Sequence, residues 1–400
     1  FALDQRPETA QGRAMPFRRH PPPRFDLSAL RWDRLDRDRL ARLVLGLAVG
    51  TVGGFVAYAL NAPLAFMLGS LFGTMAASIA GWPVAGSMRL RSAFLIVIGL
   101  FLGQSFNAEL LARMAAWPFS IALAILYIPA AAWLAFLYYR RVAGMNRADA
   151  LFSCVPGGLS GVVLIAGALG ADERRVALAQ SLRVAFVVAA APAVFFGLLG
   201  YEAPEVAAHA PEIVSWGSAA ALALAAAAGV AALAAIGAPL PFLLGPMAAS
   251  AVLRLGGWVE GELPHWMVEG ALIVVGSSIG VRFAGVALSE FRRIAAATLV
   301  ATVIMILVSG LFSLLSMLIL GVPAAPAMLA YAPGGVAEMA LIAIAIDADP
   351  GFVATHHLAR ISFILLLAPF AGAWITRRWA AGRGGGSGGR GPSGDRGAGG

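Results

Sequence analysis

Residues 332–347 read APGGVAEMALIAIAID, a stretch that joins a Pro-Gly-Gly run to an apolar, helix-forming pattern. Glu338 adds an acid within that pattern. Residues 155–170, VPGGLSGVVLIAGALG, repeat the arrangement without the acid. Proline lacks a backbone donor and glycine tolerates positive φ. We therefore expect both stretches to hold interrupted helices.

The composition is that of a membrane protein. Hydrophobic residues make up 60% of the chain and charged residues 12%, whereas soluble domains carry about 25% charged residues. Apolar stretches that can cross about 30 Å of hydrocarbon recur from Ala41 onward. The sequence thus predicts an all-α polytopic membrane protein. We expect no signal peptide, since an Arg- and Pro-rich stretch precedes the first apolar run.

Internal similarity divides the chain into two halves. At a constant offset of 177, residues 155–192 and 332–369 are identical at fifteen of 38 positions. Residues 95–106 match 272–283, and residues 61–69 match 237–245. These matches predict a tandem duplication. The most informative identities are Pro156/Pro333, Gly157/Gly334, Gly158/Gly335, Asp172/Asp349, Arg183/Arg360 and Pro192/Pro369.

The predicted organisation has five regions. Two membrane repeats, 41–200 and 214–379, are joined by an acidic periplasmic loop, 201–213. An Arg/Pro-rich cytoplasmic tail, 1–40, precedes them, and a Gly/Arg-rich tail, 380–400, follows. The second tail has too little apolar surface to fold, so we expect it to be disordered. The arginines of the first tail suit cytoplasmic anchoring, because that tail is too short and too mixed in charge for a DNA-binding domain.

Two topologies fit the apolar segments. If all twelve cross the membrane, the repeats are parallel, and the short-loop arginines divide eight inside against six outside. If the two Pro-Gly-Gly segments are re-entrant, each repeat makes five crossings and the second repeat is inverted. Twelve arginines then lie inside and only Arg113 and Arg254 outside. Arginine accumulates on the cytoplasmic side, so we prefer inverted repeats with both termini cytoplasmic. The segments are 41–60, 63–81, 92–106, 116–139, 151–170, 176–200, 214–236, 239–257, 268–283, 294–320, 327–347 and 353–376.

The interrupted helices are the predicted substrate site. A helix that begins inside the protein offers free N–H groups and about half a positive charge to an anion. Arg183 and Arg360 occupy equivalent positions and suit bidentate binding of an oxyanion; ion pairs with Asp172 and Asp349, or snorkelling, are the alternative. The candidate substrate-binding residues are Pro156, Gly157, Gly158, Arg183, Pro333, Gly334, Gly335 and Arg360.

The second repeat alone carries additional titratable groups. Glu338, Asp347, His356 and His357 stand where the first repeat has Gly161, Gly170, Ala179 and Gln180. Acids and histidines near a buried site are suited to proton coupling, so these four are the candidate proton-coupling residues. The alternative is that Asp347 and the histidines are solvated at the membrane interface and that Glu338 bonds a backbone group.

The sequence resembles the AbrB family of duplicated bacterial membrane proteins, over about residues 41–379. The family is also labelled ammonia monooxygenase or AbrB-type regulator. The resemblance implies a multi-pass protein of the bacterial inner membrane. The first repeat departs from the second by having Gln180 and Ser181 in place of His and Leu. The stretches that carry the resemblance are PGGLSGVVLIAGALGADERRVALAQSLRV, PGGVAEMALIAIAI, HHLARISFILLLAP and the pair PLAFMLG/PLPFLLG.

The residues favour transport over catalysis. An ammonia oxidase needs clustered metal ligands, but His20, His209 and His265 are scattered, so we expect no enzyme activity, metal or cofactor. We predict a secondary transporter of a small, anionic solute, coupled to protons and working by alternating access. The alternative is a membrane-embedded sensor that affects gene expression indirectly. Expected partners are a small-molecule or ion substrate and the lipid bilayer, without direct nucleic-acid binding. The sequence leaves open whether the protein forms a homo-oligomer.

Overall fold

The computed structural model describes residues 37–155, 166–167, 170–201 and 213–384. The predicted tail up to residue 36, most of the acidic loop and the tail from residue 385 lie outside this range. So do Pro156, Gly157 and Gly158. The described chain is helical, as predicted: apart from one isolated bridge between Ile213 and Glu262, it contains no β-structure.

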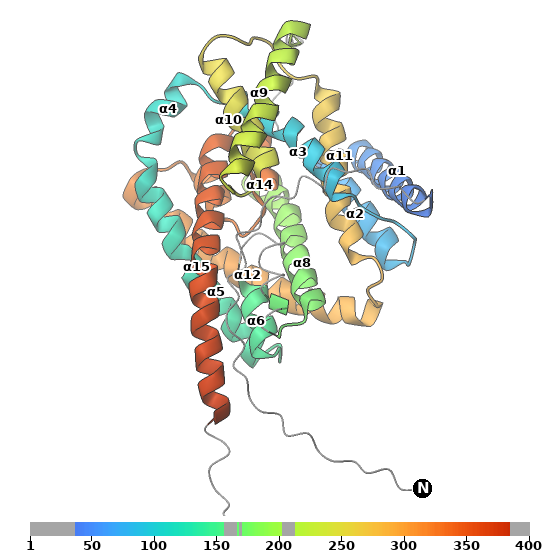
Figure 1. The fold of residues 1–400 in the computed structure, drawn as a ribbon, viewed down its shortest axis with the longest axis vertical. Coiled ribbons are helices and arrows are strands. Elements are labelled where there is room, and N and C mark those ends of the chain that lie inside the picture. Colours follow the sequence, from blue (N-terminus) through green and yellow to red (C-terminus); the bar gives the residue numbers. More distant parts are fainter. Residues whose placement is uncertain (1–36, 156–165, 168–169, 202–212, 385–400) are drawn as a thin grey trace, which may run out of the picture.

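The predicted apolar segments with described residues fall on helices, and the segment 327–347 forms two (Figure 1). The first half forms α1 (Arg37–Ala59), α2 (Ala65–Ile79), α3 (Met88–Gly103), α4 (Ala108–Met114), α5 (Trp117–Arg141), α6 (Arg147–Cys154) and α8 (Glu173–Pro192), which continues as the π-helical η2 (Ala193–Leu198). The second half forms α9 (Trp216–Ala235), α10 (Pro241–Leu255), α11 (His265–Gly280), the 3-10 turn η3 (Val281–Phe283), α12 (Leu288–Leu320), α13 (Ala324–Tyr331), α14 (Val336–Ala345) and α15 (Pro350–Gly384). The last helix extends past the boundary predicted at residue 379.

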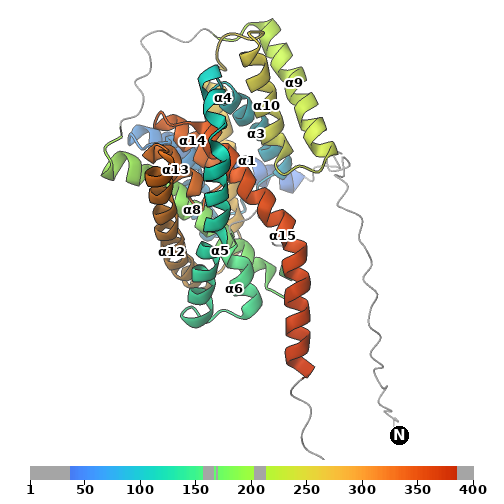
Figure 2. The ribbon, with the colours of Figure 1, turned by 90° about the vertical axis from the view of Figure 1, so that its left-hand side faces the viewer.

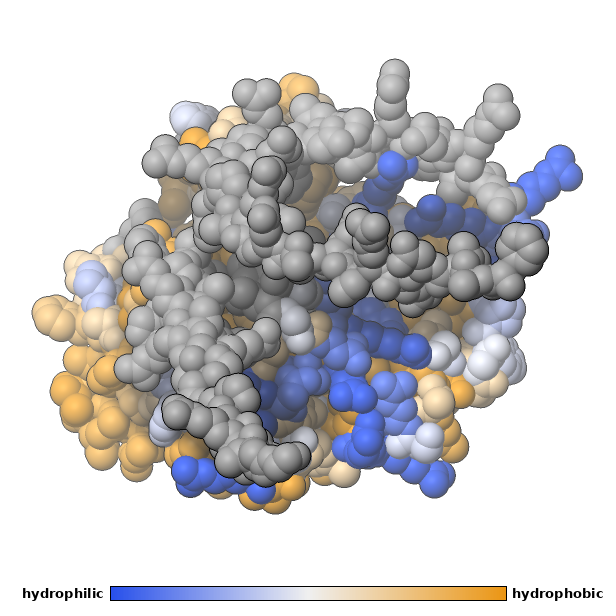
Figure 3. Space-filling model, turned by 60° about the horizontal axis from the view of Figure 1, so that its bottom comes forward, coloured by the Kyte–Doolittle hydropathy of each residue, from blue (hydrophilic) through white to orange (hydrophobic). Residues whose placement is uncertain are grey.

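Seven helical stretches in the described chain are long and apolar enough to span a membrane: α1, α5, α8 with η2, α9, α11 with η3, α12 and residues 350–367 of α15. Shorter apolar helices, α2, α10 and α14, pack among them. The protein is therefore a multi-pass membrane protein. Seen from the end where α6 lies, hydrophilic side chains gather in the middle of the visible surface and apolar side chains on its flanks (Figure 3).

Corresponding helices of the two halves share an unusual start. The residue before α2 is Leu64, with φ of 49°, and the residue before α10 is Leu240, with φ of 51°. Positive φ is rare for a bulky residue. Each of these helices packs against the helix before it, α2 against α1 and α10 against α9. Each half therefore contains one helix hairpin of this design.

The second helix of each hairpin packs against a helix of the other half. Helix α2 packs on α11, and α10 packs on α3 (Figure 1). Both crossings use two glycines four residues apart, Gly276 and Gly280 in α11 and Gly99 and Gly103 in α3. A Cβ atom on any of the four would collide with a carbonyl oxygen of the facing helix. Small residues at this spacing let two helix backbones approach closely.

Helices α5 and α12 form a long antiparallel pair. The ring centroids of Tyr127 and Phe312 are 5.8 Å apart, and Tyr139 interacts with Thr298, so the register runs in opposite directions along the two helices. The α5 start and the α12 end thus share one end of the pair. Figure 2 shows α12 beside α5.

The turns that follow the two interrupted segments lie at opposite ends of this pair. At the α12 start, Arg174 donates to the Gly285 carbonyl. The Asp172 N–H donates to Asp149 in α6 at 2.8 Å, so residues on both sides of the first interrupted segment share this end. At the α5 start, the Trp117 ring packs on Phe352 of α15, with centroids 5.5 Å apart.

Candidate functional site

The second Pro-Gly-Gly run interrupts a helix, as the sequence predicts. Helix α13 ends at Tyr331 and α14 begins at Val336. Ten residues of α-helix span about 15 Å, half the thickness of the hydrocarbon layer. All residues from Val336 to Ala343 are buried. The N-terminus of α14 therefore lies inside the protein, where its free N–H groups are shielded from bulk water.

Arg360 holds this interruption in place. The side chain is buried, with 3% of its surface exposed. Its Nη1 donates to the Ala332 carbonyl at 2.6 Å, and its Nη2 donates to the Gly334 carbonyl at 2.7 Å. Nη2 also donates to His357 Nδ1 at 2.9 Å. One guanidinium group thus binds the backbone on both sides of Pro333.

Arg183 makes the corresponding contacts in the first half. Its Nη1 donates to the Val155 carbonyl at 3.2 Å, and its Nη2 donates to Gln180 Oε1 at 3.3 Å. Val155 corresponds to Ala332 at the repeat offset. The alternative pairing with the aspartates is not seen for Arg183. Asp172 caps α8 instead, since it accepts the N–H groups of Arg174 and Arg175.

Gln180 and His357 support the two arginines in the same way. His357 Nε2 donates to the Leu329 carbonyl at 2.9 Å, and Gln180 Nε2 donates to the Phe152 carbonyl at 2.8 Å. A carbonyl only accepts, so Nε2 carries the His357 proton, and Nδ1 accepts from Arg360. His357 is neutral in this arrangement and positions Arg360. Its predicted exchange of a proton stays a prediction.

Tyr127 of α5 lies within electrostatic range of both arginines. It is fully buried, and its hydroxyl has no hydrogen-bond partner among the described residues. The Nε atoms of Arg183 and Arg360 also lack one within the described part of the chain. Neither arginine forms an ion pair with a carboxylate of those residues. A buried, unpaired charge costs several kcal/mol, and such residues in membrane proteins mark functional sites.

His356 has a hydrogen-bond network of its own. Its Nδ1 lies 2.7 Å from the Phe352 carbonyl, and its Nε2 lies 2.8 Å from Ser120 Oγ. Ser120 Oγ is also 2.9 Å from the Trp117 carbonyl. The Ser120 hydroxyl has one proton, which it can donate either to the Trp117 carbonyl or to His356 Nε2. Rotation of the Ser120 hydroxyl is thereby linked to the proton on His356 Nε2.

Asp347 lies apart from the other candidates. It is exposed, follows the C-terminal end of α14 and has φ of 53°. It lines a cavity of about 480 Å³ with residues of α4, with Asn107 directly before α4 and with Pro350 at the start of α15. Glu338 is in the first turn of the same helix. The length of α14 therefore separates the two acids, and the structure does not bring them together.

Glu338 faces two arginines that sequence reasoning missed. It is buried, and its Oε1 lies 3.8 Å from Arg91 Nη2. Arg282 of η3 interacts with both Arg91 and Glu338 and lies 3.5 Å from Ser181 Oγ. From the sequence, both arginines count among the short-loop arginines. The available signal was Arg282, which falls inside the predicted apolar segment 268–283.

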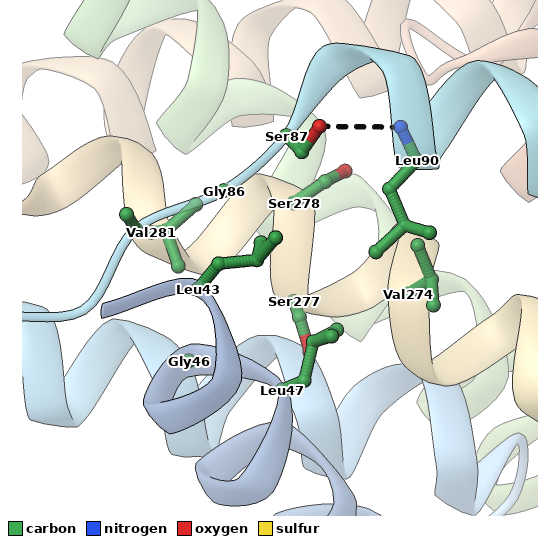
Figure 4. Close-up of a pocket in the computed structure, with 11 residues that line it drawn as sticks. Leu43, Gly46, Leu47, Gly86, Ser87, Leu90, Val274, Ser277, Ser278 and Val281 are labelled. Carbon is green, nitrogen blue, oxygen red and sulfur yellow. Dashed lines mark hydrogen bonds between the residues drawn. The ribbon is translucent and has the colours of Figure 1, made fainter. Parts of the chain in front are cut away.

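A small pocket between α1, α3 and α11 opens beside Ser87, which caps α3 by accepting the Leu90 N–H at 3.3 Å (Figure 4). Its volume of about 10 Å³ suffices for roughly one water molecule and for no solute. Within the described residues, no three His, Cys, Asp or Glu side chains are grouped closely enough to hold a metal ion.

Comparison with known proteins gives a consistent assignment. A protein-family model described as "Transition state regulatory protein AbrB" matches residues 66–376. The "Putative regulator AbrB" of Escherichia coli (strain K12) is 30% identical over 335 residues, which cover 81% of this chain and 92% of the relative. The "Uncharacterized protein YhjN" of Bacillus subtilis (strain 168) is 26% identical over 348 residues, with 81% and 90% covered. Both halves of the chain take part in these matches.

Proposed function

We propose that this chain, which belongs to the AbrB family of multi-pass membrane proteins, is a secondary transporter of a small anionic solute and not an enzyme. One observation carries the proposal. Arg183 and Arg360, equivalent residues that each donate to the carbonyl directly before a Pro-Gly-Gly run, lie near Tyr127 without a carboxylate partner in the described chain. Guanidinium groups bind carboxylates and other oxyanions, and interrupted helices in matching positions are typical of transporter substrate sites.

The proposed architecture is a pair of inverted repeats with ten crossings and two re-entrant segments. The hydrogen bond between Asp172 and Asp149 supports re-entry of the first segment, because a crossing segment would hold those residues about 30 Å apart. The turns after the two segments lie at opposite ends of the α5–α12 pair, which supports the inversion. Arg91 and Arg282 lie near each other, whereas twelve crossings would separate them by a membrane.

Alternating access follows from this architecture. The glycine crossings of α2 on α11 and of α10 on α3 are two equivalent contacts between the halves, and α5 pairs with α12 across the same division, so the proposed movement involves helices of both halves. The proposed solute site is at the interior start of α14, where Arg360 binds the preceding turn, with Arg183 as its counterpart in the first half. Glu338 and His356 are the proposed proton-exchanging groups, and His357 positions Arg360.

Reconstitution tests the proposal directly. Purified protein in proteoliposomes is assayed for uptake of labelled small carboxylates and inorganic oxyanions under an imposed proton gradient. We expect saturable uptake of at least one solute and a loss of at least about tenfold in Arg360→Lys, which keeps the charge but loses the planar fork. Arg254→Gln is the control, since Arg254 binds a surface carbonyl of Gly261 at 2.9 Å. Normal uptake by Arg360→Lys and Arg360→Gln would remove Arg360 from the site.

The same assay addresses the sensor alternative. The Escherichia coli relative is named a regulator, and the matching family is described as a regulatory protein. A membrane sensor would bind a solute saturably and move none of it. Binding to proteoliposomes without accumulation inside them would therefore favour a sensor and contradict transport.

A further inference from the structure

We propose that Arg91 and Arg282 form a carboxylate-binding site that the Glu338 side chain occupies in this structure, and that the carboxylate of a small solute replaces it when Glu338 is protonated. This inference rests on the proposed transport function and specifies its substrate class as a small carboxylate. It also supplies the coupling, since a proton and a solute carboxylate must arrive together.

Within the described chain, the ion pair with Glu338 leaves part of the Arg91 guanidinium group without a hydrogen-bond partner. Arg91 Nη2 and Glu338 Oε1 are 3.8 Å apart, longer than the roughly 2.7–2.9 Å of a charge-assisted hydrogen bond. The Arg91 Nε atom is buried and has no hydrogen-bond partner among the described residues. A guanidinium group can bind a carboxylate through two parallel N–H groups. Glu338 therefore offsets the charge of Arg91 but does not accept a hydrogen bond from its Nε–H group.

The charges favour a replacement anion when Glu338 becomes neutral. The carboxylate of Glu338 pairs directly with Arg91, at 3.8 Å, and the charge of Arg282 acts on both of them. Arg282 also lies 3.5 Å from the Ser181 hydroxyl, which can donate to a bound oxyanion. Protonation of Glu338 would leave these two half-buried guanidinium groups without the charge of the carboxylate. A solute carboxylate then restores the balance of charge.

The start of α14 adds to the attraction. Glu338 lies in its first turn, and a Cβ atom on Gly335 would collide with the Glu338 carboxylate. The carboxylate is thus folded back over the beginning of its own helix, where N–H groups and the helix dipole favour an anion. At the repeat offset, the residue that matches Glu338 is Gly161, so this carboxylate has no counterpart in the sequence of the first half.

The other buried titratable groups on the helices around α14 already have partners. Arg183 of α8 and Arg360 of α15 bind backbone carbonyls. His357 of α15 bonds Leu329 and Arg360, His356 bonds Phe352 and Ser120, and Tyr331 of α13 donates to the Ser120 carbonyl at 2.8 Å. Together with Arg91 of α3 and Arg282 of η3, they complete the charged surroundings. Glu338 is the acid among them, so its proton sets the charge that Arg91 and Arg282 face.

Acetate binding to the full-length purified protein tests the site. Glu338→Gly copies the residue of the first half, and Glu338→Gln keeps the shape without the charge. We expect sodium acetate, compared with sodium chloride at equal concentration, to raise the thermal unfolding midpoint of both variants saturably, by about 2 °C or more at ten times half-saturation. The wild-type midpoint at neutral pH should not respond. Adding Arg91→Gln to either variant should abolish the response.

Two outcomes overturn the inference: neither variant responds to acetate more than the wild type does, or the response survives Arg91→Gln. Gel filtration identifies folded variants, and either variant suffices. Uptake by wild-type proteoliposomes separates this inference from the proposed function. If the variants bind acetate but wild-type proteoliposomes take up no solute, the carboxylate-binding site is supported and the transporter proposal is contradicted. If wild-type proteoliposomes take up solute but the variants do not bind acetate, the transporter proposal is supported and the carboxylate-binding site is contradicted.

Discussion

Gln180 and His357 build one hydrogen-bonding pattern from two different side chains. Each donates to a carbonyl of a short helix and accepts from the arginine three residues later. The amide and the neutral imidazole present donor and acceptor at similar positions. The pattern, rather than the residue type, is therefore what the two halves share.

This equivalence predicts the effect of replacing His357. His357→Gln should keep both hydrogen bonds and lower the stability by no more than about 1 kcal/mol. His357→Leu should lower it by about 2–5 kcal/mol, because the Leu329 carbonyl and an Arg360 N–H are then buried without partners. Thermal unfolding of the purified variants measures the difference. Equal destabilisation by both substitutions would contradict the positioning role.

The repeat drew attention to single residues where it supplied a second copy. Arg183 and Arg360 stand out in the sequence because both lie in apolar helices at one offset. Arg91 and Arg282 have no such counterpart, since Val268 and Ser105 occupy the matching positions. An arginine near the end of an apolar segment is ordinary, because it can reach the interface. Only the packing of α3, η3 and α14 brings these two to Glu338.

At the scale of elements, the helix crossings are set by glycine. Gly276→Ala places a methyl group against the Met67 carbonyl oxygen, so α11 and α2 must move apart. We expect a loss of about 1–3 kcal/mol, as for overpacked cores, seen as a lower unfolding midpoint. Gly310→Ala is the matched control. A Cβ atom there meets nothing within 4 Å, and alanine is the better helix former by about 1 kcal/mol, so its midpoint should stay or rise.

Equal behaviour of the two alanine variants would show that the crossing does not depend on close approach.

The interruption at Pro333 was predictable from the sequence, because Pro-Gly-Gly cannot continue a helix. The crossing partners were not. The spacing of Gly99 and Gly103 indicates a close helix contact, but nothing in the sequence says that α10 of the other half fills it.

At the scale of the whole molecule, the arrangement of the halves can be tested with two equivalent alanines. In a Cys154→Ala background, Ala171→Cys and Ala348→Cys each introduce one thiol, at positions related by the repeat offset. Cys154 itself is buried. We expect a membrane-impermeant thiol reagent to label Ala348→Cys in intact cells and Ala171→Cys only after permeabilisation.

Labelling of both thiols from the same side would indicate parallel repeats and remove the basis for alternating access by inversion. The sequence could suggest the inversion only through the arginine count of the loops. The structure contributes the contacts at the two ends of the α5–α12 pair, which depend on distant residues such as Arg174 and Gly285.

The replacement of Gly161 by Glu338, and of Gln180 by His357, has a consequence for energetics. With two identical halves related by inversion, the inward-open and outward-open forms would be superimposable and equally stable. Different side chains at equivalent positions remove that degeneracy. A difference of about 1.4 kcal/mol suffices to favour one form tenfold. We therefore expect the proposed transporter to favour one resting side, and the differences between its halves to determine which side that is.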